Sequence, residues 1–252
     1  SVWSMAVPRA ATTLAGDGIL RLSSRGEVEL RSVATGEVTW TTRVAPRVGA
    51  PALAFTVTAP GLPRLVILAE GERRLVALDL RTGEARWTYT ARHGGTFKMR
   101  RVGKLLIVVS GEAAVTAIDL ASGELVWRFG DRVPFTTTAL VHREQVTVLA
   151  GEGSRGPARL YTLDAYTGAL QWVTEADAPA CSTPTATGDT VALGLSTREG
   201  VVLAGFGATK GEARFRTPLG VLPGTGGVRP ATAAFDDLFV TNLPTGRVVA
   251  ID

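Results

Sequence analysis

The strongest constraint on the fold is a short motif that recurs along the chain. It reads LVALDLRTGEARW at 75–87, VTAIDLASGELVW at 115–127 and LYTLDAYTGALQW at 160–172. Each copy has an Asp, then a hydroxyl residue followed by Gly, and then Trp four residues after that Gly. Self-similarity with a period of about 20–50 residues is typical of repeat architectures, so the fold is best read from the repeat.

The step from Gly to an aromatic residue four positions later sets the period. Its five copies are Gly36/Trp40, Gly83/Trp87, Gly123/Trp127, Gly168/Trp172 and, with Phe instead of Trp, Gly211/Phe215. Trp3 adds a sixth aromatic anchor before Trp40. The six anchors cover the chain at a mean spacing of about 42 residues, which is close to the length of a propeller blade repeat.

Each period has the texture of four short strands. Between residues 96 and 130 the segments TFKMRRV, KLLIVVS, AVTAIDL and LVWRFG are rich in strand-forming residues and are bounded by turn residues. No window of about 11 residues sustains a helical apolar stripe, so no long helix is expected. Four antiparallel strands in about 40–45 residues are the blade pattern of a β-propeller. The sequence therefore predicts an all-β fold, a six-bladed β-propeller of four-stranded antiparallel blades.

The two ends of the chain predict how the propeller closes. The C-terminal GRVVAID matches the third strand of the repeat, and the N-terminal SVW matches the fourth. We therefore expect Trp3 and Asp252 to lie on adjacent strands of one blade, so that N- and C-terminal strands close the ring. Five or seven blades stay open as alternatives if the Phe215 copy is misread. Residues 1–252 are predicted to form a single propeller domain, and we expect that domain to be part of a longer protein.

The repeated residues have a structural explanation. Gly adopts a positive φ at little cost, and an Asp carboxylate can accept hydrogen bonds from the N–H groups of the turn that follows it. Trp offers a broad apolar face for packing between blades and an indole N–H for a backbone acceptor. We assign this structural role to Asp79, Gly83, Trp87, Asp119, Gly123, Trp127, Asp164, Gly168 and Trp172, with Trp40 and Trp3. Ser32 and Gly207 stand at the Asp position of the weaker copies, which favours a structural role over a catalytic one.

The motif resembles the PQQ-like β-propeller repeat, also called the quinoprotein tryptophan-docking motif. ALDLRTGEARW (77–87) and AIDLASGELVW (117–127) fit its pattern A-x-D-x-x-T/S-G-x-x-x-W closely, and TLDAYTGALQW (162–172) fits with one change. The resemblance implies a propeller but leaves two kinds of function. The family includes pyrroloquinoline-quinone alcohol dehydrogenases. It also includes non-enzymatic members, such as the lipoprotein subunit of the bacterial outer-membrane protein assembly machine and propellers fused to signalling kinases.

The enzymatic branch of that family is disfavoured by the residues it uses. Its dehydrogenases stack the quinone against a disulfide of vicinal cysteines and hold calcium beside a catalytic Asp. Cys181 is the single cysteine, so this disulfide cannot form. The acidic residues lie mostly in turns, and no local calcium loop is present. We therefore predict that the chain is not an enzyme, with no catalytic residues, no cofactor and no metal site.

Other constellations lack the context that their chemistry needs. GEGSRG at 151–156 matches a phosphate-binding loop only formally, because it lies between strands and no helix follows. His93 and His142 have no Cys or His partner at metal-ligand spacing. A Ser-His-Asp triad assembles across a fold, so the sequence alone leaves it open.

One pattern outside the motif points to a binding surface. The segments that lead from each fourth strand into the next blade should gather on one face, and five of six carry Arg. The candidate interaction rim consists of Arg9, Arg47, Arg92 with Arg100 and its neighbour Arg101, Arg132 and Arg229. Glu175 and Asp177 mark the exception. Such a rim could receive an acidic peptide, a phosphate-bearing ligand or nucleic acid; the plain alternative is a set of solvated loop arginines.

The predicted function is a non-catalytic interaction scaffold that binds a protein partner through its inter-blade loops, and an acidic partner is one option. The alternatives are a sensor propeller for a small anionic molecule at the channel mouth and, less favoured, a quinoprotein-type oxidoreductase. Nucleic acid is disfavoured because few aromatic residues interleave with the arginines. No apolar run approaches the roughly 18 residues of a membrane-spanning helix, and no signal-peptide pattern opens the chain. We expect a bacterial, monomeric domain, and its compartment, periplasmic or cytoplasmic, stays open.

Overall fold

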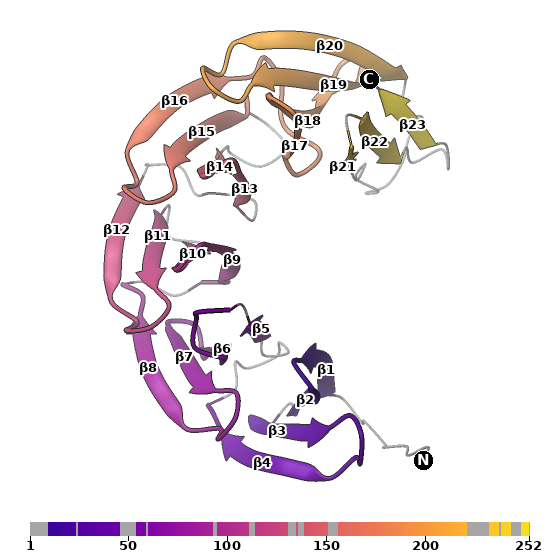
Figure 1. Cartoon of the computed structure of the whole chain (residues 1–252). Helices are drawn as coiled ribbons and strands as arrows, with labels where there is room; N and C mark the ends of the chain where they lie inside the picture. The colour runs from indigo at the N-terminus through magenta and orange to yellow at the C-terminus, as the bar shows by residue number, and fades with distance from the viewer. Residues whose placement is uncertain are drawn as a thin grey trace. The chain divides into compact units, whose positions relative to one another are not determined.

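A computed structural model describes most of the chain. The described residues are 10–23, 25–45, 54–58, 60–92, 95–110, 114–130, 135, 139–150, 156–220, 232–236, 238–242 and 248–251. All regular elements among them are β-strands, grouped in six sheets (Figure 1). Within these ranges no helix is long and apolar enough to cross a membrane.

Each sheet is a meander, because strands that are neighbours in the sheet are neighbours in the sequence. The first sheet consists of β1 (Ala10–Ala15), β2 (Gly18–Ser23), β3 (Glu27–Ser32) and β4 (Val38–Arg43). The second consists of β5 (Ala54–Val57), β6 (Leu65–Glu70), β7 (Arg74–Asp79) and β8 (Ala85–Thr90). The third consists of β9 (Lys98–Val102), β10 (Leu105–Ser110), β11 (Ala114–Asp119) and β12 (Leu125–Gly130).

The remaining sheets follow the same plan. The fourth consists of β13 (Leu140–His142), β14 (Gln145–Ala150), β15 (Arg159–Asp164) and β16 (Leu170–Glu175). The fifth consists of β17 (Thr185–Thr187), β18 (Thr190–Thr197), β19 (Gly200–Gly207) and β20 (Ala213–Gly220). The sixth has three described strands, β21 (Thr232–Phe235), β22 (Leu238–Asn242) and β23 (Val248–Ile251).

This architecture confirms the all-β, four-strand repeat that the sequence predicts. The four strands expected between residues 96 and 130 are β9–β12, with ends that agree within two residues. Ring closure by Trp3 and Asp252 stays a prediction, because both residues lie outside the described ranges. The prediction of one domain over residues 1–252 is also left untested.

The described residues divide into two compact units. The first unit contains the chain up to Phe97 together with Gly103–Leu106 and Ile118–Leu125, and the second contains the rest. In the first unit the core lies between the first and second sheets and includes Leu20, Val28, Val66 and Leu78. In the second unit the corresponding core lies between the fourth and fifth sheets and includes Leu160, Leu193 and Phe206.

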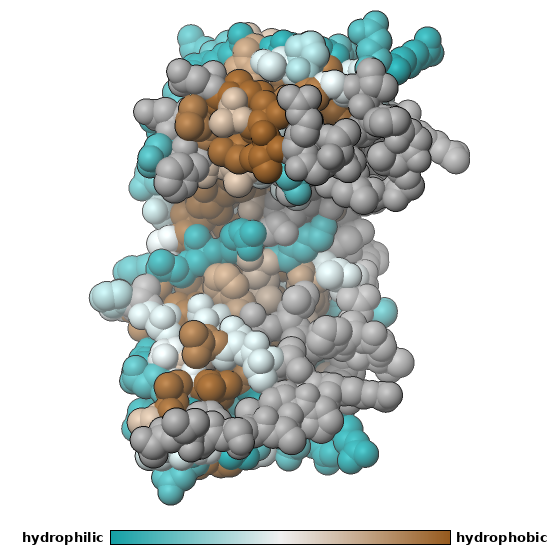
Figure 2. All heavy atoms as spheres, turned by 90° about the vertical axis from the view of Figure 1, so that its right-hand side faces the viewer, coloured by the Kyte–Doolittle hydropathy of each residue, from teal (hydrophilic) through white to brown (hydrophobic). Residues whose placement is uncertain are grey.

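In the four-stranded sheets the two central strands are the most deeply buried. All six residues of β10 are buried, whereas the outer strands β8, β12 and β16 bury only the central Trp. A strand whose two faces are both covered reads as a continuous apolar run, and this explains KLLIVVS in the sequence. The sixth sheet exposes some apolar side chains: Leu238 is 37% and Val248 is 69% exposed. Hydrophobic side chains also gather in the upper part of the view in Figure 2.

Candidate functional site

Each strong copy of the motif forms the turn between the third and fourth strands of a sheet. Oδ1 of Asp79 accepts hydrogen bonds from the backbone N–H groups of Arg81, at 2.8 Å, and Thr82, at 3.3 Å. The equivalent sets are Asp119 with Ala121 and Ser122, and Asp164 with Tyr166 and Thr167. Each carboxylate is therefore engaged by its own turn.

Each motif Trp packs against the Gly of the next repeat. Trp87 lies over Gly123, which has a φ of +76° and where a Cβ would stand 2.6 Å from Cγ of Trp87. Nε1 of Trp87 donates a hydrogen bond of 2.9 Å to the backbone carbonyl of Leu120. The other sets are Trp40 with Gly83 and Leu80, Trp127 with Gly168 and Ala165, and Trp172 with Gly211 and Ala208. The Trp thus belongs to one sheet, and the Gly and carbonyl that receive it belong to the next.

The pH dependence of the free energy of unfolding should reveal how much the ionised Asp164 carboxylate stabilises its turn. Hydrogen bonds from the backbone N–H and hydroxyl of Thr167 lower the pKa of Asp164 from its usual 3.8. Because the folded-state pKa is depressed, the ionised carboxylate stabilises the fold above its unfolded pKa, and this contribution is lost as pH falls through the folded-state pKa.

Asp164→Asn should therefore be less stable than the wild type at neutral pH, and the difference should shrink as pH falls below about 4. Thermal denaturation of both proteins between about pH 2 and pH 7 measures this. A difference that does not change with pH would contradict the assigned role of the carboxylate.

The fifth copy, which has Gly207 in place of the motif Asp, takes its carboxylate from another turn. Asp189 lies between β17 and β18, and its Oδ1 accepts a hydrogen bond of 3.0 Å from the Thr209 hydroxyl. Nη2 of Arg214 donates to Oδ2 of Asp189 at 2.5 Å, and this bond lowers the pKa of Asp189. In the second copy the arginine at the same motif position pairs with the motif Asp itself. The arginine therefore keeps a carboxylate partner although the motif Asp is absent.

The first copy, which has Ser32 at the Asp position, also has an Asp on the equivalent turn, but the exposed Asp17 carboxylate lies 3.8 Å from Nη2 of Arg64 rather than on the motif turn. The backbone carbonyl of Asp17, in the β1–β2 turn, accepts a hydrogen bond of 3.1 Å from Val33. In the fifth copy the carbonyl of Asp189 accepts the equivalent bond from Ala208 at 3.0 Å, so the two aspartates hold equivalent positions. In the three copies with the motif Asp, the residues at this position are Arg64, Lys104 and Glu144. An Asp stands on this turn only in the copies that lack the motif Asp.

The structure describes three of the seven rim residues named from the sequence, Arg92, Arg100 and its neighbour Arg101. Arg92 lies in the exposed segment after β8, and its carbonyl accepts a hydrogen bond from Arg73 of the β6–β7 hairpin. Arg100 is exposed on β9, within a strand, and its Nη1 donates to the carbonyl of Met99 at 3.1 Å. The other four, Arg9, Arg47, Arg132 and Arg229, lie outside the described residues. The rim as a surface therefore stays a prediction.

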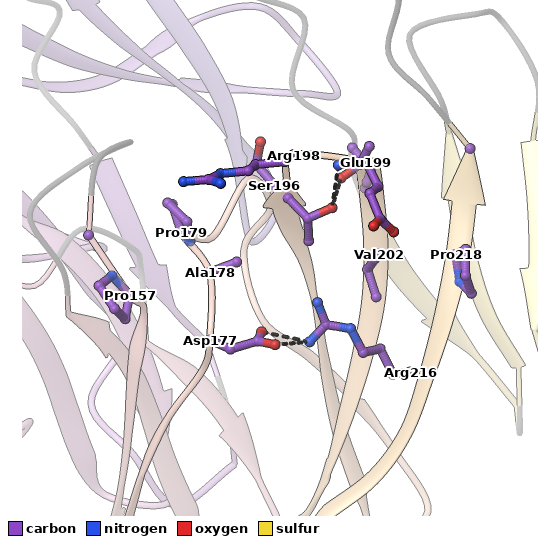
Figure 3. A pocket seen from close by; sticks show the side chains of 15 residues that line it. Pro157, Asp177, Ala178, Pro179, Ser196, Arg198, Glu199, Val202, Arg216 and Pro218 are labelled. Atoms are coloured by element: carbon purple, nitrogen blue, oxygen red, sulfur yellow. Dashed lines mark hydrogen bonds and ion pairs between the residues drawn. The ribbon is translucent and has the colours of Figure 1, made fainter.

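The segment after β16, which carries Asp177 where the other connections carry Arg, borders an open cleft of about 910 Å³ in the second unit (Figure 3). The cleft lies where the fourth and fifth sheets meet, and three groups of residues line it. They are Gly156 and Pro157 before β15, Asp177–Pro179 after β16, and Ser196–Val202 with Arg216, Pro218 and Gly220 of the fifth sheet. Its volume lies within the range of about 300–1,000 Å³ of ligand-binding pockets.

The acidic residues of that segment are neutralised by arginines of neighbouring strands. Nη1 of Arg216 donates to both carboxylate oxygens of Asp177, at 2.6 and 2.5 Å, and this bond lowers the pKa of Asp177. Nε of Arg159 donates to Glu175 at 2.7 Å. Both carboxylates are consequently already paired, and Arg198 at the tip of the β18–β19 hairpin lines the same cleft as Asp177 (Figure 3).

Sequence reasoning did not find Arg198 or Arg216. The rim prediction concerns the connections between sheets, whereas Arg198 lies in a hairpin within a sheet and Arg216 lies on an outer strand. Strands β18 and β19 have two more residues each than β6, β7, β10 and β11, and the additional residues lie at the hairpin end, in LSTREGV (195–201).

Comparison with known proteins shows to which protein family this architecture belongs. The family model described as outer membrane protein assembly factor BamB matches residues 24–156 and 112–252. The two matches together span residues 24–252. The chain belongs to this family. The PQQ-like resemblance of the motif is thereby confirmed.

Solved structures agree with the BamB family fold. BamB from Moraxella catarrhalis superposes with a TM-score of 0.66 at 19% sequence identity, over 94% of this chain and 68% of that one. Sqt1 from Saccharomyces cerevisiae has a TM-score of 0.66 at 11% identity, over 96% of this chain and 69% of that one. A europium-containing methanol dehydrogenase has a TM-score of 0.58 at 12% identity, over 86% of this chain and 53% of that one. No curated protein is similar enough in sequence to count as a relative.

At these identities the likeness establishes the fold alone. An assembly factor of the BamB family and a methanol dehydrogenase share the architecture, so the fold does not decide whether a member catalyses a reaction. The function must be argued from the surface of this chain.

Proposed function

We propose that this BamB-family propeller is a non-catalytic scaffold that binds a protein partner through the loops at the β18–β19 end of its second unit. The cleft between the fourth and fifth sheets is the observation that carries the proposal. It is open, it is lined by residues of both sheets and their connections, and it carries donor groups on Arg198 that have no partner among the described residues. Arginine is enriched at protein–protein interfaces because its planar guanidinium pairs with carboxylates in defined geometry.

The rigidity of the surrounding sheets supports this role. Val201 and Val202 line the cleft and are 1% and 8% exposed, so its floor belongs to the packed core. Loops placed on a rigid scaffold commonly carry binding sites, because the scaffold fixes their positions before the partner arrives. The family description, an assembly factor, also fits a scaffold.

Site-specific photocrosslinking tests the proposal. A photoreactive phenylalanine analogue replaces Glu199 at the hairpin tip, or Lys210 in the β19–β20 turn at the other end of the same sheet, in the producing organism. We expect one discrete crosslinked protein from position 199 and none from position 210. The crosslinked protein, once identified and purified, should bind the wild type with a measurable Kd. No crosslink from position 199, or the same products from both positions, would overturn the proposal.

The oxidoreductase alternative makes the opposite prediction in a direct assay. A quinoprotein of this fold would reduce an artificial electron acceptor when supplied with pyrroloquinoline quinone, calcium and a primary alcohol. We expect the purified chain to show no turnover above the buffer rate. Turnover that saturates with the quinone would replace the scaffold proposal with the enzymatic one.

A further inference from the structure

We infer that the cleft binds an extended acidic segment of the partner, whose carboxylates pair with Arg198 and Arg216. The inference rests on the proposed function and names the kind of partner sequence that the cleft takes. It follows from four features of the second unit: an extended wall, a fixed hairpin tip, unfilled guanidinium donors and a proline-rich lining.

The fifth sheet supplies the extended wall. Strands β18, β19 and β20 have eight residues each, whereas β6, β7 and β8 of the second sheet have six. The register pairs Thr190 with Gly207 at the motif end and Thr197 with Gly200 at the hairpin end. Because the motif ends coincide, the two additional residues of each strand lie at the cleft. At about 3.3 Å per residue they raise the wall by about 6–7 Å.

The hairpin that ends this wall is fixed by its own hydrogen bonds. The Thr197 hydroxyl donates to the carbonyl of Gly200 at 2.8 Å, and the backbone N–H of Glu199 donates to Oγ1 of Thr197 at 3.3 Å. The N–H of Ser196 donates to the carbonyl of Pro179 across the base of the cleft at 2.8 Å. The backbone that carries Arg198 is therefore ordered before a ligand binds, which lowers the entropic cost of binding.

Two guanidinium groups on the cleft have donors to spare. Arg198 makes no hydrogen bond or ion pair with any residue in the described part of the chain, so all five of its N–H donors are open to a ligand. Arg216 uses Nη1 for Asp177, and its Nε and Nη2 have no partner among the described residues. Its side chain is 44% exposed. Carboxylates are the natural acceptors for such donors because they pair with arginine in a bidentate geometry.

The remaining lining favours a peptide over a small free anion. Two arginines and two acidic residues, Asp177 and Glu199, leave the lining without net charge, so it does not concentrate anions by its overall field. Three prolines, Pro157, Pro179 and Pro218, add apolar surface to Ala178 and Val202 (Figure 3). A ligand gains there only if it combines local carboxylates with apolar contacts, as an extended acidic segment does.

Defined peptide pools test the inference. The probe is a pool of fluorescein-labelled nonapeptide amides that all have Asp at positions four and six. Each of the other seven positions holds an equimolar mixture of residues that excludes Asp, Glu and Cys. The comparison pool has Asn at both positions. By fluorescence anisotropy, the wild type should bind the Asp pool about tenfold more tightly than the Asn pool, a typical gain for a charge-assisted pair. An equal affinity for the two pools would overturn the inference.

Variants separate recognition from structural effects. Arg198→Gln should abolish the preference for the Asp pool without changing Tm, and Lys210→Gln, which removes one positive charge at the other end of the sheet, should leave the preference intact. Asp177→Asn releases Nη1 of Arg216 and should strengthen Asp-pool binding, whereas a purely structural ion pair predicts weakening. An unchanged preference in Arg198→Gln, or weaker Asp-pool binding in Asp177→Asn, would contradict the inference.

A third pool identifies the source of the carboxylate. The Asn peptide with a free C-terminus should bind no better than its amide. If it binds as tightly as the Asp pool, the cleft recognises a chain terminus and the extended-segment inference is wrong. If the pools do not differ while position 199 still crosslinks a specific partner, the inference fails and the proposed scaffold function stands.

Discussion

Replacement of Trp127 by alanine is expected to lower the free energy of unfolding by about 3–5 kcal/mol. The side chain is 8% exposed and packs over Gly168 of the next repeat. The variant loses this contact area together with the hydrogen bond of 3.0 Å from Nε1 to the carbonyl of Ala165. Equilibrium denaturation in urea, monitored by circular dichroism, measures the change.

Two further variants apportion this loss. Trp127→Phe keeps an aromatic ring but leaves the buried carbonyl of Ala165 without its donor, so a smaller cost of about 1–3 kcal/mol is expected. Val126→Ala changes the neighbouring side chain, which is 48% exposed, and should cost within about 0.5 kcal/mol. A cost for Trp127→Ala as small as that for Val126→Ala would contradict the docking role of the Trp.

Replacement of Gly168 by alanine should destabilise the fold from the opposite side of the same contact. Gly168 has a φ of +71°, and a Cβ would stand 2.6 Å from Cδ2 of Trp127. Backbone strain of about 1–3 kcal/mol and overpacking of about 1–3 kcal/mol together predict a cost of about 2–6 kcal/mol. The same urea denaturation measures it.

Gly188→Ala is the matched control for this variant. Gly188 also has a positive φ, +51°, but nothing lies within 4 Å of a Cβ built there. Its substitution should therefore cost only the backbone strain, about 1 kcal/mol. Equal costs at the two positions would show that the close approach of Trp127 contributes nothing and that the Gly is needed for its φ alone.

The repeated part of the fold could be predicted from the sequence because all copies of the repeat share the same pattern. Strand ends, the Asp–Gly turn and the inward-facing Trp recur at a fixed spacing, so a weak signal in one copy is supported by stronger ones. The target of each Trp could not be read in this way. Trp87 is 36 residues from Gly123 in the sequence but only 4 from Gly83, and only the packing of two sheets shows which of these glycines receives it.

The relocated carboxylate and the cleft escaped prediction for a different physical reason. Asp189 is an ordinary turn residue in the sequence, and its bonds to Thr209 and Arg214 become visible only when two turns of one sheet lie side by side. The ion pair of Asp177 with Arg216 joins residues 39 positions apart. Such a contact depends on side-chain geometry between neighbouring sheets, which residue periodicity does not encode.

The contact between each Trp and the following Gly also gives the sheets that share it a direction. One face of a sheet carries the donor Trp, and the turn beside its opposite face carries the acceptor Gly and carbonyl, as in Trp127 received by Gly168 and Ala165. Two copies of one sheet cannot pair through the same face, because two indoles would meet and neither would find its carbonyl. The motif therefore encodes the order of assembly: sheets add to one another head to tail, and stacking in the reverse sense leaves a buried indole N–H without an acceptor.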